Sequence, residues 1–365
     1  MSSAGPATTV VWLALAIGMV FGAVAGRTRF CTMGAVADIV NLGDWGRMRM
    51  WLLAIAVAIL GTATLDAAGF IDVDRSIYRG TSLNWLSHLT GGLCFGFGMV
   101  LASGCAARTL GRIGAGSVKA LVVFLVLGLV AYMTMRGVLA VFRVNVLDTV
   151  ALHLPGGQGL PELIASIGLT PQPALCAWFV GCGLLAIVVL IRPRLASDQF
   201  LGGAAVGALV VSGWYVSGYL GYVAEDPETL QEAFLATNSG RMESLTFVAP
   251  QAYTLELLLL WSDSTRRVTF AIASTLGVVV GSLGQALLAG SFRWEGFRDL
   301  EDTTNHLVGA VLMGFGGVVA MGCTIGQGIT GVSTLAAGSF LSLFAIIAGA
   351  RLAIGYQYWR AEHGG

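Results

Sequence analysis

Charged residues are scarce in this chain of 365 residues. Asp, Glu, Lys and Arg make up only 11% of it, and Lys119 is its single lysine. An average soluble domain carries roughly 25% charged residues. Because 56% of the residues are hydrophobic, the sequence cannot supply the surface of a soluble protein. The net charge is zero, so no basic tract invites nucleic acid. We predict an all-α polytopic protein whose main partner is a lipid bilayer.

Motifs for metal, redox and nucleotide chemistry are also missing. No two cysteines form a Cys-x-x-Cys pair, and no histidine lies at ligand spacing from one, which argues against zinc, iron–sulfur and thioredoxin-type sites. The cysteines lie in or beside apolar runs, so a disulfide framework is not expected. The absence of a Walker motif argues against direct coupling to ATP within this chain. We expect no cofactor, no metal and no catalytic residue.

Glycine is abundant instead. The chain has 51 glycines, about twice the usual share of ~7%, and they lie inside the hydrophobic runs. Spacings such as Gly18-x3-Gly22-x3-Gly26 and Gly92-x3-Gly96 place small residues on one helix face. This arrangement lets helix backbones approach closely in lipid, and we interpret most of these glycines as packing contacts.

Runs of about twenty apolar residues are long enough to cross a bilayer. The sequence predicts nine of them, at about 9–26, 49–69, 86–103, 118–141, 173–191, 200–221, 267–290, 306–321 and 334–356. Pro250 and Glu256 interrupt a tenth apolar stretch, 244–262, which we predict to be re-entrant or interfacial.

One segment is written twice in the sequence. Residues 88–105 recur 218 positions later as residues 306–323, with ten of eighteen positions identical and no gap. Both copies begin with His-Leu and end with Gly-Cys. Internal repeats with interrupted hydrophobic segments are the usual pointer to a transporter's binding site.

The duplication divides a single transmembrane transporter domain, residues 1–365, into two halves. We place the first at about 9–141 and the second at about 200–356, joined by a connecting helical region, 142–199. The two copies are the third and the eighth predicted spans, an odd number of crossings apart, so they should be inverted relative to one another. Arginines follow the first run and none precedes it, which favours a retained helix over a cleaved signal. With Arg108, Arg112 and Lys119 inside and the acidic loop 222–243 outside, the N-terminus is predicted to be outside.

Three segments share one form: an apolar half-helix, a cysteine and a short loop with glycine. Their cysteines are Cys31, Cys105 and Cys323, and Gly104 and Gly322 precede the last two. Irregular backbone at membrane depth is tolerated only where it is buried in protein or lines an aqueous path. Broken helices also expose N–H groups that attract anions. Since a thiol can donate a weak hydrogen bond and contact a soft sulfur atom, this pattern favours a sulfur-containing oxyanion.

Other polar residues lie in or near these loops and have more than one plausible role. Arg29, Arg108 and Gln327 could serve an anion path, although the arginines could equally reach the lipid headgroups. His88 and His306 open the repeated half-helices, and capping or interfacial anchoring is the plainer interpretation, with a proton or metal site as the alternative. We interpret Cys94, Cys176 and Cys182 as packing residues.

Together, the motifs resemble one known family. The runs Gly26-Arg-Thr-Arg-Phe-Cys-Thr-Met-Gly-Ala-Val-Ala-Asp38, Ser-Gly-Cys-Ala-Ala-Arg108 and Gly-Cys-Thr-Ile-Gly-Gln-Gly328 look like the YeeE/YedE family of sulfur-compound transporters. The resemblance implies a multi-pass protein of the bacterial inner (cytoplasmic) membrane that imports thiosulfate, and a cytoplasmic TusA-like sulfur carrier as possible partner. It also implies that Cys31, Cys105 and Cys323 pass the anion along by hydrogen bonds, without a covalent intermediate.

The leading hypothesis is therefore import of thiosulfate or a closely related sulfur anion. We expect the substrate to be held by Cys31, Cys105, Cys323, Gly104, Gly322, Arg29 and Gln327. Two alternatives remain open at this point: a channel for selenium compounds or other anions, and a membrane enzyme that hands sulfane sulfur to a TusA-like carrier.

Overall fold

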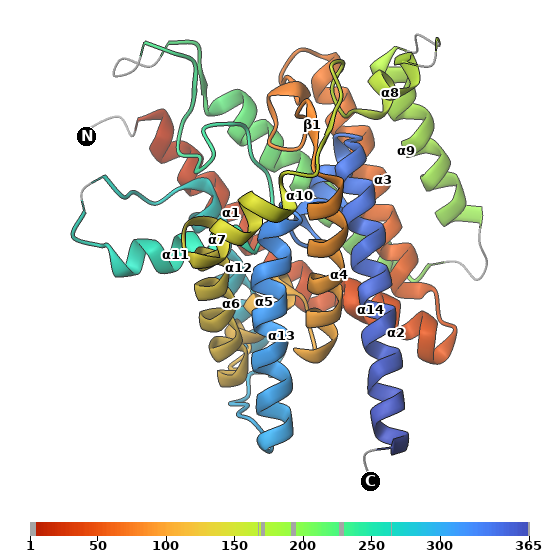
Figure 1. The fold of residues 1–365 in the computed structure, drawn as a ribbon, viewed down its shortest axis with the longest axis vertical. Coiled ribbons are helices and arrows are strands. Elements are labelled where there is room, and N and C mark those ends of the chain that lie inside the picture. The colour runs from red at the N-terminus through yellow and green to blue at the C-terminus, as the bar shows by residue number, and fades with distance from the viewer. Residues whose placement is uncertain are drawn as a thin grey trace.

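The computed structural model describes residues 5–166, 168, 172–190, 195–225, 230–263 and 265–363. Helices run across the molecule between two ends (Figure 1). We call the end at which the chain begins the N-terminal face, and the opposite end, where the chain finishes, the C-terminal face. Part of the predicted outer loop, 226–229, lies outside the described residues.

Helices account for nearly all regular structure. They are α1 (Pro6–Thr28), α2 (Thr32–Leu42), α3 (Gly46–Ala67), α4 (Trp85–Leu101), α5 (Ala106–Gly114), α6 (Val118–Arg136), α7 (Val138–Phe142), α8 (Leu160–Ser166), α9 (Pro173–Leu190), α10 (Ser197–Tyr215), α11 (Ala249–Leu259), α12 (Phe270–Leu288), α13 (Leu300–Val319) and α14 (Ala337–His363). A 3-10 turn, η1 (Val73–Arg75), and three π-helical segments, η2 (Arg143–Leu147), η3 (Val216–Leu220) and η4 (Gly326–Gly331), complete them.

Strands are confined to two small antiparallel pairs. In the first pair, β1 (Ser82–Leu83) lies beside β2 (Leu152–His153), and in the second, β3 (Tyr222–Val223) lies beside β4 (Ala233–Phe234). Both pairs belong to loops between helices. The protein is therefore an all-α polytopic membrane protein, as predicted.

Among the described residues, eight helical segments are long and apolar enough to cross a membrane. They coincide with eight of the nine predicted spans. The ninth, 306–321, lies within α13, which is not one of the eight. The first turns of α13 are polar, because Glu301, Asp302 and Asn305 precede its apolar part. Asp299 caps this helix, accepting a hydrogen bond from the Asp302 N–H at 2.7 Å. The stretch 244–262 contains α11, whose eleven residues are too few to span a bilayer.

The two repeat copies form α4 and α13, which cross each other in opposite directions. A Cβ on Gly309 would lie 2.7 Å from the Ala102 nitrogen, and one on the equivalent Gly91 would meet the equivalent Ala320 nitrogen. The two copies thus touch through the same positions in both directions, as an inverted repeat requires. No side chain larger than hydrogen fits at either crossing, which explains why both copies carry glycine there.

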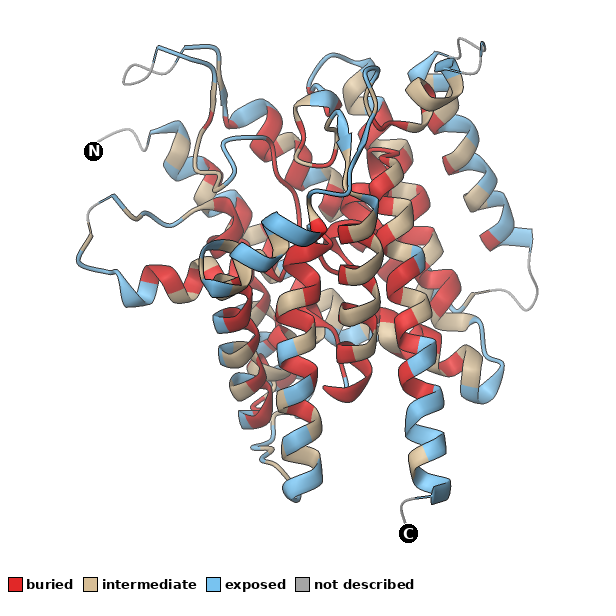
Figure 2. Ribbon diagram, viewed as in Figure 1, coloured by how far each residue is buried: buried red, intermediate tan, exposed pale blue. Residues whose placement is uncertain are grey.

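Buried residues concentrate at mid-height, where α4, α13 and α14 meet (Figure 2). Both repeat helices end in this region, and their Gly-Cys turns therefore lie inside the protein rather than at a membrane surface. The longer connecting segments, which carry both strand pairs, gather toward the N-terminal face (Figure 1). The fold thus brings irregular backbone to the centre of the helix bundle, where lipid cannot reach it.

Candidate functional site

The three predicted cysteines share one local backbone. Two positions before each of them lies a residue in the left-handed region: Arg29 (φ 54°), Ser103 (φ 55°) and Met321 (φ 59°). This conformation ends the preceding helix and turns the chain. Cys31 and Cys105 are then the N-cap residues of α2 and α5. Each cysteine is therefore presented beside N–H groups at the start of a new segment.

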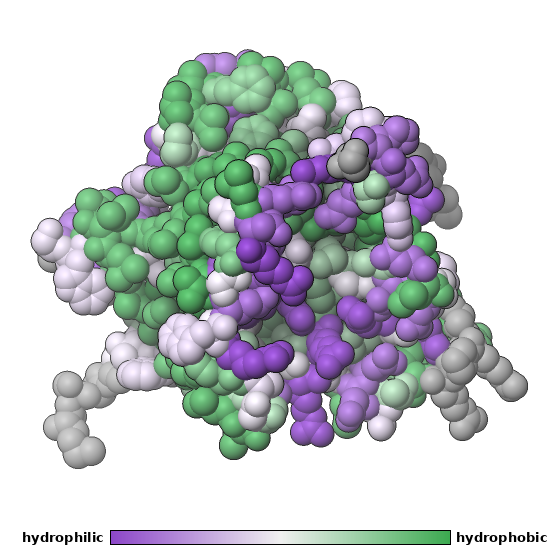
Figure 3. Space-filling model, turned by 90° about the horizontal axis from the view of Figure 1, so that it is seen from below, coloured by the Kyte–Doolittle hydropathy of each residue, from purple (hydrophilic) through white to green (hydrophobic). Residues whose placement is uncertain are grey.

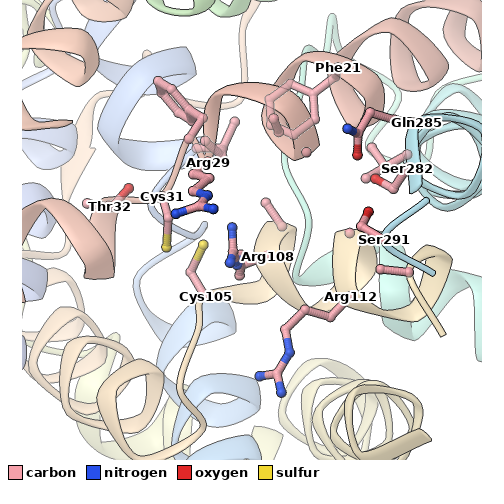
Figure 4. Close-up of a pocket in the computed structure, with 18 of the residues that line it drawn as sticks. Phe21, Arg29, Cys31, Thr32, Cys105, Arg108, Arg112, Ser282, Gln285 and Ser291 are labelled. Carbon is pink, nitrogen blue, oxygen red and sulfur yellow. The ribbon is translucent and has the colours of Figure 1, made fainter. Parts of the chain in front are cut away.

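Cys31 and Cys105 come together although 73 residues separate them in the chain. Their thiols are within hydrogen-bonding reach of each other, and Figure 4 shows the two sulfur atoms facing one another. The backbone N–H groups of Met33 and Gly34 face the Cys31 sulfur, and that of Arg108 faces the Cys105 sulfur. The site thus has a pair of soft sulfur atoms surrounded by weak hydrogen-bond donors.

Cys323 lies deeper and has no exposed surface. The Gly326 N–H donates to its sulfur at 3.4 Å, and the Thr246 side chain and the Phe247 backbone also face it. The next residue, Thr324, is fully buried, and its hydroxyl faces the Cys105 thiol. Thr324 therefore links the third cysteine to the thiol pair.

A cavity of about 380 Å³ adjoins the thiol pair. Its wall comes from the C-terminal half of α1, from α5, from the C-terminal half of α12 and from the segment after it. The lining residues with polar or sulfur-bearing side chains are Arg29, Cys31, Thr32, Cys105, Arg108, Arg112, Ser282, Gln285, Ser291 and Arg293, most of which are labelled in Figure 4. None of the described residues of the wall carries a carboxylate, so the cavity suits an anion.

The positive side chains of this cavity are only partly neutralised. Arg112 pairs with Glu295 at 3.4 Å, and Lys119 pairs with the same carboxylate at 2.8 Å. The Lys119 hydrogen bond lowers the pKa of Glu295, which lies in the loop after α12. Within the described part of the chain, neither Arg29 nor Arg108 is in an ion pair. These two guanidinium groups are therefore available to an anion in the cavity.

A second hollow of about 310 Å³ shares Arg108 and Arg112 with the first and adds Ser103, Lys119 and Arg298. Glu295 and Asp302 also line it, so its basic side chains outnumber its carboxylates. Hydrophilic residues gather across the centre of the C-terminal face, with apolar side chains around them (Figure 3). The two hollows thus form a positively charged entrance that leads from this face toward the thiol pair.

The remaining predicted site residues lie at the turns. A Cβ on Gly104 would lie 2.9 Å from Arg108 Cγ, and one on Gly322, whose φ is 159°, would lie 3.0 Å from Gln327 Cγ. Both glycines thus allow a following side chain to pack against the turn. Gln327 Nε2 donates to the Ala320 carbonyl at 2.6 Å, whereas its buried Oε1 has no hydrogen-bond partner within the part of the chain that the structure describes. Cys323, Gly322 and Gln327 do not line the cavity.

Several residues of the site lay outside the prediction. Gln285 and Arg293 belong to α12 and to the segment after it, where no motif marks them. Thr324 lay within the quoted Gly-Cys-Thr motif, and its polarity beside a buried cysteine was the available signal. Cys94, Cys176 and Cys182 are free and are not part of the cavity wall.

Comparison with known proteins agrees with this architecture. The chain is 27% identical to the thiosulfate transporter TsuA of Escherichia coli (strain K12) over 95% of each chain. It is 26% identical to the thiosulfate transporter TsuA of Spirochaeta thermophila, over 93% of this chain and 96% of the relative. A family described as Sulphur transport matches residues 27–352, so the protein belongs to that sulphur-transport family, as the YeeE/YedE resemblance had indicated.

Proposed function

We propose that this protein imports thiosulfate or a closely related sulfur anion. The observation that carries the proposal is the Cys31–Cys105 thiol pair at the end of an arginine-lined cavity. Support also comes from the two relatives, both named thiosulfate transporters, which match nearly the whole chain.

The site offers different partners for the two ends of thiosulfate. Its oxygen atoms share the negative charge with the terminal sulfur and accept charge-assisted hydrogen bonds, which Arg29, Arg108 and the N–H groups at the helix starts can donate. Its terminal sulfur is soft and polarizable, and it suits contact with the thiols. Sulfate lacks this soft end, so discrimination between the two anions falls to the cysteines.

The path runs between the thiol pair and Cys323, with Thr324 between them. Each thiol offers only a weak hydrogen bond to the terminal sulfur, and a permeation path requires sites that release the ion as readily as they bind it. Transfer between stations therefore needs no covalent bond to sulfur. The protein then acts as a transporter and not as an enzyme, because its substrate leaves unchanged.

We further propose that the protein resides in the bacterial inner membrane with its C-terminal face in the cytoplasm. Arg27, Arg47, Arg108, Arg112 and Lys119 lie in or beside short loops at that face, as the positive-inside rule requires. Import then proceeds from Cys323 to the thiol pair and out through the positive entrance. A TusA-like carrier is the proposed recipient, and it would dock at this same face.

Substitution of the cysteines tests the path. In a sulfur-auxotrophic host that depends on this protein for thiosulfate, Cys105→Ala and Cys323→Ala should each abolish growth on thiosulfate. Cys94→Ala is the matched control, since Cys94 lies in the repeat helix α4 that leads to Cys105 but outside the cavity, and it should grow normally. Normal growth of both Cys105→Ala and Cys323→Ala cells, with the proteins present in the membrane, would reject the thiol path.

The choice of anion needs a separate measurement. The selenium and general-anion alternatives share the cavity but not the preference for a soft sulfur end. In uptake by proteoliposomes, thiosulfate should compete with labelled thiosulfate far better than sulfate does. Equal competition by sulfate would favour a general anion channel, and stronger competition by selenite would favour a selenium transporter.

A further inference from the structure

His88 does not cap its helix, contrary to expectation. It lies in the first turns of α4, which begins at Trp85, and it is only 4% exposed. Its Nδ1 lies 2.7 Å from the Ser342 hydroxyl of α14. The ring is therefore held by a neighbouring helix inside the protein, and capping does not explain its place there.

Ser342 continues this contact to the end of α13. Its Oγ is 3.5 Å from the Ala320 carbonyl, which also accepts a hydrogen bond from Gln327 at 2.6 Å. Ala320 is the C-cap of α13 and stands three residues before Cys323. The negative end of the α13 dipole thus points at the Cys323 turn, where it opposes an anion. A positive charge beside Ala320 would offset that effect.

The other side of the ring faces Gln158. His88 Nε2 and Gln158 Oε1 lie 2.5 and 2.9 Å, respectively, from the point that a Cβ on Gly338 would occupy. Gln158 is 6% exposed, and its Oε1 has no hydrogen-bond partner among the described residues. A doubly protonated ring would have N–H donors toward both Ser342 and Gln158, so the surroundings offer acceptors for the charged form.

A hollow toward the N-terminal face lies next to Gln158. Gln158 lines a hollow of about 270 Å³ together with the carboxylates of Asp74 and Glu162. Both carboxylates pair with Arg79, Asp74 at 3.5 Å. Titratable side chains thus stand next to Gln158, and Gln158 separates them from His88.

We propose that His88 is a proton-binding site linked to the anion site at Cys323. The inference rests on the proposed function. One proton from solution at the N-terminal face binds the neutral imidazole when an anion occupies the Cys323 turn, and the same proton leaves when the anion leaves. Linkage is reciprocal, so protonation tightens anion binding as much as anion binding favours protonation. One positive charge then accompanies the anion into a site of low dielectric.

Few other charges act on the ring. Asp148, at the end of η2, exerts a coulombic influence on it and is itself held by the Ser87 hydroxyl at 2.7 Å and by Arg143 at 3.3 Å. Among the described residues, α13 and α14 reach the ring through Ala320, Gly338 and Ser342, none of which titrates.

The equivalent histidine of the second copy provides a matched control. His306 Nδ1 lies 3.0 Å from Asp302 on its own helix, and Asp302 is 3.7 Å from Lys119. Its ring makes an edge-to-face contact with the ring of Phe297. It thus belongs to a charge cluster near the C-terminal face and has no contact with a cysteine turn. Substituting it removes a histidine without touching the proposed proton site.

The test measures protons and thiosulfate together. Purified protein in a weakly buffered solution with a pH indicator is mixed with thiosulfate, and the thiosulfate Kd is determined between pH 5.5 and 7.5. The intact protein should take up protons on binding, and its Kd should rise about tenfold for each unit of pH above the His88 midpoint. His88→Gln should bind thiosulfate with a Kd that varies much less with pH and with less proton uptake. His306→Gln should behave as the intact protein does.

Each outcome separates the two proposals. Thiosulfate binding with equal proton uptake by the intact protein and by His88→Gln would overturn the role of His88 and leave the proposed function standing. Absence of thiosulfate binding in every variant would overturn the proposed function itself. If His88→Gln does not fold, Ser342→Ala decides, because loss of the Nδ1 contact should move the midpoint of the Kd profile to lower pH. An unmoved midpoint would overturn the proposal.

Discussion

The two copies of the repeated segment share a backbone but differ in chemistry. Ser103 and Met321 occupy equivalent positions and have nearly the same φ, 55° and 59°. After the shared Gly-Cys, however, the first copy continues with Ala106 and Arg108, and the second with Thr324 and Gly326 at the same positions. The duplicated part thus builds the turn, and the residues after the cysteine determine what the turn can bind.

The surroundings of the two cysteines differ accordingly. Cys105 lines a cavity with several arginines, whereas Cys323 is fully buried and does not line it. The first copy presents a thiol where a charged anion enters or leaves, and the second holds a thiol where no guanidinium contacts it. Inverted repeats thus supply two similar turns that meet at the centre of the membrane, and divergence of a few side chains gives each its own role.

The largest effect is expected when the charge that distinguishes the first copy is removed. Arg108→Gln should weaken thiosulfate uptake about tenfold to a hundredfold, because a hydrogen bond to a charged group contributes about 1.5–3 kcal/mol. The measurement is initial uptake by proteoliposomes over a range of thiosulfate concentrations. Arg351→Gln is the control, since Arg351 is an exposed residue of α14 outside the cavity. Equal uptake by the two variants would remove Arg108 from the site.

Substitutions at the glycines where the two repeat helices cross should lower stability by similar amounts. Gly91→Ala and Gly309→Ala each force a methyl group against the opposite repeat helix, and each should lower stability by about 1–3 kcal/mol, as overpacking usually does. Thermal unfolding in detergent measures the change. Gly183→Ala, in the exposed α9 with open space around it, should leave the Tm unchanged or raise it. A clear difference between the two repeat variants would mean that the crossing is not symmetric.

The smallest effect concerns the carboxylate beside the positive entrance. Lys119 lowers the pKa of Glu295, so the pair stabilises the folded state above the ordinary Glu pKa, and this contribution is lost as the pH falls through the lowered value. Because Glu295 is 44% exposed, Glu295→Gln should cost at most about 1 kcal/mol at pH 7. The Tm difference from the intact protein should close in acid. Glu362→Gln should show no such difference.

The sequence predicted the parts of the site that carry a local signature. The Gly-Cys turns, the two repeat helices and the short 244–262 segment could be recognised because apolar runs and glycine spacing are local properties. The apolar run 306–321 was predicted to cross the membrane for the same reason, but the polar start of α13 leaves it outside the eight described segments that are long and apolar enough to do so.

Contacts between distant segments could not be predicted in the same way. The pairing of Cys31 with Cys105 depends on how α1, α4 and α5 pack, and no spacing in the sequence encodes it. Gln285 and Arg293 line the cavity because α12 packs along α1, where Gly18 and Gly22 let the two helix backbones approach closely. His88 was expected to cap a helix or to anchor it at the interface. Its actual partner, Ser342, lies 254 residues away, so no local pattern could indicate the contact.

The most direct test of the account follows the two sulfur atoms of thiosulfate across the membrane. Proteoliposomes containing the purified protein are given thiosulfate labelled only at its terminal sulfur, and the internal contents and the protein are then analysed by mass spectrometry. The account predicts intact labelled thiosulfate inside and no label on Cys31, Cys105 or Cys323. Label retained on a cysteine as a persulfide, with sulfite released, would contradict it and make the protein a sulfur-transfer enzyme.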